Sequence, residues 1–82
     1  MEIHEVRAVV GRNVRAFAKE RRITLNRLID FAETSKGQLY NVLRGTTSPT
    51  VDWLTKVANA LEVEPWQLLA PRPKKSSARS GR

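Results

Sequence analysis

The chain has 82 residues, enough for one domain, and its lack of cysteine excludes a disulfide framework and thiolate metal sites. The formal net charge of +7 is unevenly placed: residues 1–45 carry +4, residues 46–70 carry −2 and residues 71–82 carry +5. A one-sided positive field of this kind favours a polyanionic partner.

The sequence lacks the features of several functional classes of protein. The sequence has no run of about 18 apolar residues, so we expect no membrane-spanning helix. Its first ten residues lack the basic-then-apolar order of a secretory signal, and a soluble cytoplasmic protein is expected. The single histidine, His4, has no partners at ligand spacing, so neither a metal nor another cofactor is expected. Without a nucleophile-base pairing or a glycine-rich phosphate loop, we expect no enzyme.

The first predicted helix covers residues 5–22. Val6, Val10, Val14 and Phe17 recur at the spacing of one helical face, which indicates a buried stripe. The outer face of this segment holds six cations: Arg7, Arg12, Arg15, Lys19, Arg21 and Arg22.

A second helix is predicted after Thr24, which is a good N-cap. Its apolar face comprises Leu25, Leu28, Ile29 and Ala32. The helix is short and is followed closely by a further capping residue.

The third predicted helix covers Ser35 to Arg44. Ser35 is its N-cap, and Leu39, Val42 and Leu43 form its inward stripe. Gln38 has two alternatives: it folds back on Ser35 as the partner in a capping box, which we favour, or it points outward.

Polar and small residues alternate with that inward stripe. Most carry hydrogen-bond donors of the kind that read base edges and phosphates in DNA. Two short helices joined by a tight turn, with such an outer face, predict a helix-turn-helix over residues 24–45. The outward positions of its second helix are Lys36, Gly37, Gln38, Tyr40, Asn41 and Arg44.

Gly45 is expected to end the third helix in a left-handed conformation, and Pro49 to stiffen the loop that follows. Thr50 then caps a fourth helix that extends to about residue 61. Trp53 lies off the expected buried stripe of this helix. The stripe itself contains Val51, Leu54, Val57, Ala58 and Leu61.

A short fifth helix is predicted over residues 65–70, with Pro65 at its first position. Trp66, Leu68 and Leu69 either form a dimer surface or close the monomer core; the sequence leaves both open. Residues 71–82 contain proline, serine, glycine and cations without a cluster of apolar residues, which predicts a disordered basic tail after a domain of residues 1–70. The expected fold is a compact all-α five-helix bundle.

Residues 10–69 resemble the Cro/phage-repressor type of helix-turn-helix domain, also called the xenobiotic-response-element family of bacterial regulators. The ordered series over five helices carries the likeness more than any single motif. It comprises Gly11, Val14, Leu28, Leu39, Val42, Arg44, Gly45, Pro49, Leu54, Val57, Ala58, Ala60, Leu61 and Trp66 to Leu69.

The resemblance implies a lambda-repressor-like domain that binds double-stranded DNA as a transcription regulator, of repressor type and as a homodimer. The third helix would enter the major groove. By position in the family pattern, base contacts fall on Lys36, Gly37, Gln38, Tyr40 and Asn41. Phosphate contacts fall on Arg44, Thr46, Thr47 and Asn26.

The sequence departs from the family at the turn between the second and third helices, where Glu33 replaces the usual glycine. Either Glu33 adopts a left-handed backbone or the turn differs. The alternative function is a protein-interaction module, in which Trp53 and Trp66 would anchor an unknown protein partner. Trp53 could equally be a partly buried flank of the core.

Overall fold

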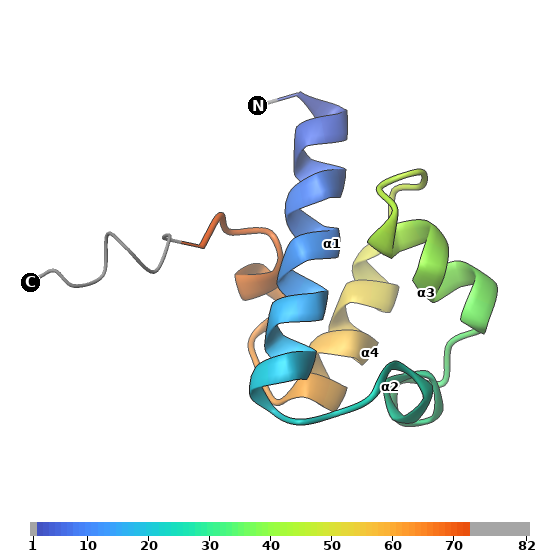
Figure 1. Ribbon diagram of the computed structural model, residues 1–82. Coiled ribbons are helices and arrows are strands. Elements are labelled where there is room, and N and C mark those ends of the chain that lie inside the picture. The colour runs from blue at the N-terminus through green and yellow to red at the C-terminus, as the bar shows by residue number, and fades with distance from the viewer. Residues whose placement is uncertain (1, 73–82) are drawn as a thin grey trace, which may run out of the picture.

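Helices account for all the regular structure in the computed structural model, which describes residues 2–72 (Figure 1). No strand occurs within that range, so the all-α expectation is confirmed for the described part. Each of these helices is also too short or too polar to pass through a lipid bilayer. In chain order they are α1 (Ile3–Glu20), α2 (Leu25–Ala32), α3 (Lys36–Leu43), α4 (Val51–Leu61) and the 3₁₀ helix η1 (Pro65–Leu68).

Two predicted helices have different bounds in the structure. The first starts and ends two residues earlier than expected, because Glu2 and Glu5 form a capping box and Arg22 has a left-handed backbone. The fifth is a 3₁₀ helix of four residues in place of an α-helix to residue 70. A capping box between Glu64 and Gln67 starts it, and a side chain of α1 takes up the carbonyl groups at its end.

The predicted N-caps of α2, α3 and α4 are present. The hydroxyl groups of Thr24, Ser35 and Thr50 each accept a hydrogen bond from the backbone N–H three residues later, at 3.2, 3.0 and 3.0 Å. These bonds satisfy amides that have no acceptor inside the helix. Local sequence therefore sets where these three helices begin.

All four α-helices end in the same way, with a residue of positive φ and a pair of hydrogen bonds back to the last turn. Gly45 has this conformation after α3, as predicted, with φ of 73°. Arg22, Glu33 and Glu62 have it after the other helices, with φ of 57°, 54° and 61°. Of the two alternatives for Glu33, the left-handed backbone is therefore the one observed.

The core gathers one stripe from each helix. Leu28, Leu39, Leu61 and Leu68 are 0% exposed and come from α2, α3, α4 and η1. Val51 was expected in the stripe of α4 but is 76% exposed, because the packed part of that helix begins two residues later, at Trp53.

Trp53 is a core residue. It is 7% exposed, and its indole Nε1 donates a hydrogen bond to Oγ1 of Thr34 at 2.8 Å. A buried indole needs a partner for its N–H, and the residue after the α2 turn supplies one. Of the two alternatives for Trp53, a place in the core is therefore the one observed.

Helix α1 lies between α3 on one side and η1 with the C-terminal end of the described chain on the other (Figure 1). Gly11 faces α3: a Cβ atom at this position would lie 2.8 Å from the carbonyl oxygen of Leu43 and 3.0 Å from that of Val42. Only glycine allows so close an approach of the two backbones.

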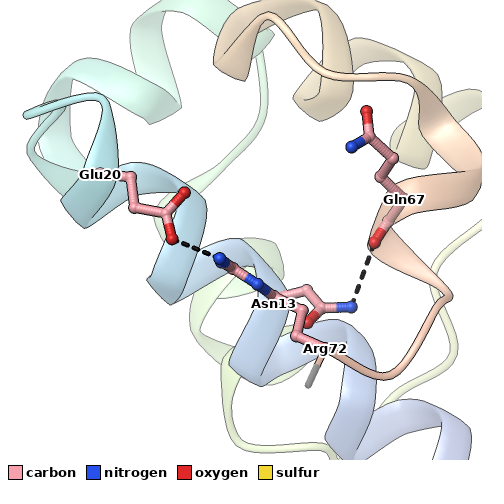
Figure 2. Close-up of polar contacts among 4 residues, drawn as sticks. All are labelled: Asn13, Glu20, Gln67 and Arg72. Atoms are coloured by element: carbon pink, nitrogen blue, oxygen red, sulfur yellow. Dashed lines mark hydrogen bonds and ion pairs between the residues drawn. The ribbon is translucent and has the colours of Figure 1, made fainter. Parts of the chain in front are cut away.

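Asn13, two residues further along α1, faces the opposite way (Figure 2). It is 3% exposed, and its Nδ2 donates to the carbonyl oxygens of Gln67, Leu68 and Ala70 at 3.2, 2.9 and 2.8 Å. A buried amide on α1 thus fixes the segment after η1.

Arg72 continues this attachment beyond residue 70. Its guanidinium pairs with Glu20 (Figure 2) and lies over the ring of Phe17, with its carbon 4.6 Å from the ring centre. The first two residues of the predicted tail therefore lie against α1. Residues 73–82 lie outside the described residues, and the division of the chain at residue 70 stays a prediction.

Candidate nucleic-acid interface

Helix α3 is held at one end and open at the other. Its C-terminal carbonyl groups press against Gly11 of α1, and Leu39 and Val42 are buried beneath it. Its N-terminal end lies at the edge of the molecule, away from α1 (Figure 1). The packing therefore fixes the direction of the helix and leaves its first turn accessible.

The N-terminal half of α3 brings together three of the predicted base-contact residues. Lys36 and Gly37 are exposed, and Tyr40 is half-buried. Nζ of Lys36 lies 6.0 Å from the centre of the Tyr40 ring, within reach of a weak cation–π contact. A Cβ atom added at Gly37 would have no heavy atom within 4 Å, so the surface here is open.

Gln38 is not part of a capping box. Its backbone N–H donates to Oγ of Ser35, but the structure records no return bond from the Gln38 side chain to the Ser35 backbone. Of the two alternatives, the one that we favoured is wrong. The half-buried side chain is not held by the cap and keeps its donor and acceptor for another partner.

Asn41 and Arg44 meet in the last turn of α3. Nη2 of Arg44 donates to Oδ1 of Asn41 at 2.6 Å. The carbonyl oxygen of Asn41 also accepts the backbone N–H and the hydroxyl of Thr46, at 3.0 and 3.1 Å. The spacing of three residues between Asn41 and Arg44 could have indicated their side-chain contact from the sequence.

The predicted phosphate contacts are not all equivalent. Arg44 is exposed and has further donors beside the one directed at Asn41. Thr46 uses both its N–H and its hydroxyl within the chain, so it has to exchange a bond to reach phosphate. Thr47 is half-buried in the loop after α3, and Asn26 is exposed in the first turn of α2.

Two contacts beside α3 were not predicted. Nε of Arg7 donates to Oγ of Ser48 at 2.8 Å, which ties the loop after α3 to α1. The two residues are 41 positions apart, and no local pattern indicates such a contact. The guanidinium of Arg27 lies 5.3 Å from the ring centre of the exposed Phe31, a pair that its spacing of four residues could have indicated.

The apolar residues of the fifth element differ in burial. Leu68 is fully buried and closes the core, whereas Trp66 is 65% and Leu69 43% exposed. Leu69 shares a surface depression with Ile3, Pro49 and Leu54. Two large apolar side chains are thus left for solvent or for another molecule.

Side chains that could hold a metal do not come together within residues 2–72: no group of three or more His, Cys, Asp or Glu residues has a suitable arrangement.

The comparisons with known proteins identify relatives by structure. No protein-family model matches the chain, and no curated protein sequence matches it. A transcriptional regulator of the HTH_3 family from Vibrio cholerae superimposes with a TM-score of 0.76 and 24% identity, over 82% of this chain and 38% of that one. A hypothetical transcription factor, NHTF, from Neisseria superimposes with a TM-score of 0.77 and 25% identity, over 87% of this chain and 82% of that one.

These two structures confirm the resemblance to the Cro/phage-repressor type of helix-turn-helix domain at the level of the fold. The chain spans little more than a third of the regulator from Vibrio cholerae, which has further residues outside the shared part. The neighbours differ from this chain at about three positions in four, so they do not transfer individual contacts.

Proposed function

We propose that the protein is a sequence-specific, double-stranded DNA-binding transcription regulator of repressor type. In this proposal α2 and α3 form the helix-turn-helix, and α3 enters the major groove with its N-terminal end first. The observation that carries the proposal is the open N-terminal half of α3, with Lys36, Gly37 and Tyr40 on its surface, on a helix whose other end is fixed. The regulator fold of both structural neighbours supports it.

The first turn of α3 suits an anionic partner. The backbone N–H of Gln38 is used by the cap, while those of Lys36 and Gly37 have no acceptor within the helix. The helix dipole adds a partial positive charge at this end, beside the ammonium of Lys36. The absence of a side chain at Gly37 allows the backbone to come close to the DNA.

We assign base contacts to Lys36, Gly37, Gln38, Tyr40 and Asn41 and phosphate contacts to Arg44, Thr46, Thr47 and Asn26. Lysine donates to guanine O6 and N7, and asparagine pairs with adenine N6 and N7. The phosphate contacts place the domain on the duplex without reading its sequence.

The proposal includes a homodimer on a two-fold operator, which would set two α3 helices about 34 Å apart, one turn of DNA. The exposure of Trp66 and Leu69 supports a second copy as the partner for this surface. The alternative function, a protein-interaction module, would use the same two side chains. It is the weaker candidate because Trp53, its other proposed anchor, is buried.

The function is tested by selecting bound sites from a random DNA pool and measuring their affinities by fluorescence anisotropy across a salt series. We expect one enriched sequence and a steep fall of affinity with salt, since phosphate contacts release counterions. The Lys36→Ala, Asn41→Ala double variant should bind the selected and scrambled sites alike.

The matched control is Lys56→Ala, which removes the same charge from an exposed position on α4. It should keep the preference for the selected site. Enrichment of no sequence by the wild-type protein, or an unchanged preference in the double variant, would contradict the proposed function.

We also propose that the cations of residues 73–82 add sequence-independent phosphate contacts. Four of the five cations of residues 71–82 fall in this segment, and the fifth, Arg72, is engaged by Glu20. Removing residues 73–82 should lower the affinity and the salt dependence while leaving the base preference intact.

A further inference from the structure

The hydrogen bond between Arg44 and Asn41 has a defined polarity. A guanidinium carries only donors, so the Asn41 atom 2.6 Å from Nη2 must be the carbonyl oxygen Oδ1, and the amide nitrogen Nδ2 is turned away. We infer that Arg44 is a positioning residue for base recognition: it holds the Asn41 amide in one of two orientations and thereby sets which base Asn41 reads.

The backbone around this pair is held in place. The carbonyl oxygen of Asn41 accepts two hydrogen bonds from Thr46, and the backbone N–H of Arg44 donates to Tyr40 O at 3.0 Å. The carbonyl group of Leu43 is held against Gly11. With the backbone held, the Asn41 amide can still move about its side-chain bonds, and the hydrogen bond from Arg44 restrains that movement.

The orientation of the amide matters because a half-turn exchanges its donor and its acceptor. Adenine presents a donor at N6 and an acceptor at N7, whereas guanine presents two acceptors, N7 and O6. The amide oxygen has two lone pairs, so Oδ1 can accept from Arg44 and from adenine N6 while Nδ2 donates to N7. With Arg44 in place, Asn41 is therefore expected to read adenine. Without Arg44, the amide can turn Nδ2 toward either purine and discriminates less.

This inference rests on the proposed function and makes it more specific. A phosphate contact by Arg44 uses its remaining donors and affects all DNA sequences equally. Positioning of Asn41 affects the ratio of affinities at one base pair. The two effects are separable, since the first changes every affinity by one factor and the second changes a ratio.

The test uses the selected DNA site and its variants with guanine in place of adenine, measured with the full chain. The informative base pair is the one at which Asn41→Ala abolishes discrimination. Arg44→Met, which keeps the aliphatic stem, should reduce the adenine-to-guanine affinity ratio there by about ten-fold, within the range for one bidentate base contact. The double variant should have the same ratio as Asn41→Ala alone, because Arg44 acts through Asn41.

The matched control is Arg12→Met, which removes an equal charge from α1 beside Pro71 and Arg72. It should leave the ratio unchanged. A ratio that Arg44→Met also leaves unchanged, with affinity lowered equally on every site, would overturn the inference and leave Arg44 as a phosphate contact alone.

A second measurement does not need DNA. ¹⁵N relaxation of the Asn41 side-chain amide should show an ordered group in the wild-type protein and a mobile one in Arg44→Met. Equal mobility in the two proteins would overturn the inference while leaving the proposed function standing. If the amide is ordered but the wild-type chain prefers no sequence, the proposed function fails and the inference fails with it.

Discussion

At the C-terminal end of α3 the backbone lies so close to α1 that a Cβ atom on Gly11 would be 2.8 Å from Leu43 O, whereas at the N-terminal end a Cβ atom on Gly37 would meet nothing within 4 Å. Glycine therefore serves opposite purposes at the two ends of α3: one glycine lies opposite its C-terminal end on α1, and the other lies in its own first turn. Gly11 lets two helices pack, and Gly37 leaves a surface bare. A helix fixed at one end and open at the other is suited to present its first turn to a ligand.

The comparison predicts its largest effect at the closed end. Gly11→Val should lower the free energy of unfolding by about 3 kcal/mol, because the added side chain meets backbone atoms that cannot move aside, the upper range for overpacking. Chemical denaturation measures the change. A loss below about 1 kcal/mol would show that α1 and α3 separate easily, and the account of a fixed end would be wrong.

The next largest loss of stability is expected on the opposite face of α1, at Asn13. Asn13→Ala leaves the carbonyl oxygens of Gln67, Leu68 and Ala70 without their donor. Unfolding should become easier by about 2 kcal/mol, the cost of unsatisfied buried polar groups. Asn13→Asp, similar in shape but without the donor, should be at least as destabilising, and neither variant should change which DNA sequence is preferred. A change in preference would mean that η1 and α3 are coupled through α1.

At the open N-terminal end of α3, adding a side chain should stabilise the protein. Gly37→Ala should raise the free energy of unfolding by about 0.5–1 kcal/mol, because alanine favours the helix and has free space here. The same change should weaken binding to the selected DNA site several-fold if the backbone approaches the bases closely. Thermal unfolding and anisotropy on one preparation separate the two effects. Unchanged affinity would remove Gly37 from the contact surface.

Effects of similar or smaller size are expected at the turns on either side of α3. Glu33 and Gly45 both have a left-handed backbone, but only one is glycine. Glu33→Gly should add about 0.5 kcal/mol of stability, and Gly45→Ala should remove about 1 kcal/mol. Differential scanning calorimetry distinguishes the opposite signs. If both substitutions changed the stability in the same direction, the energetic cost of the left-handed backbone would not explain the difference between the two positions.

Much of the helical framework could be predicted from local sequence. Thr24, Ser35 and Thr50 mark helix starts through a hydroxyl and an amide three residues apart, and Gly45 marks the end of α3 through its freedom at positive φ. In each case the interacting groups are neighbours in the chain, so the pattern contains the whole interaction.

Contacts between distant parts of the chain could not be predicted. Asn13 reaches carbonyl groups more than 50 residues away, and the indole N–H of the buried Trp53 finds its acceptor in Thr34, 19 residues away. Arg22, Glu33 and Glu62 adopt a conformation that their own preferences disfavour, because the packed helices on either side fix the turn. In the candidate site, the local contact between Arg44 and Asn41 could have been indicated by its spacing of three residues, whereas the contact between Arg7 and Ser48, 41 positions apart, could not.

The central claim, that the outer face of α3 contacts DNA, is tested most directly by mapping amide chemical-shift changes as the selected duplex is added to ¹⁵N-labelled protein. The account predicts the largest changes at residues 35–41 and in the first turn of α2, with small changes at Asn13 and Trp66. Changes concentrated around Trp66 and Leu69, with α3 unaffected, would contradict it.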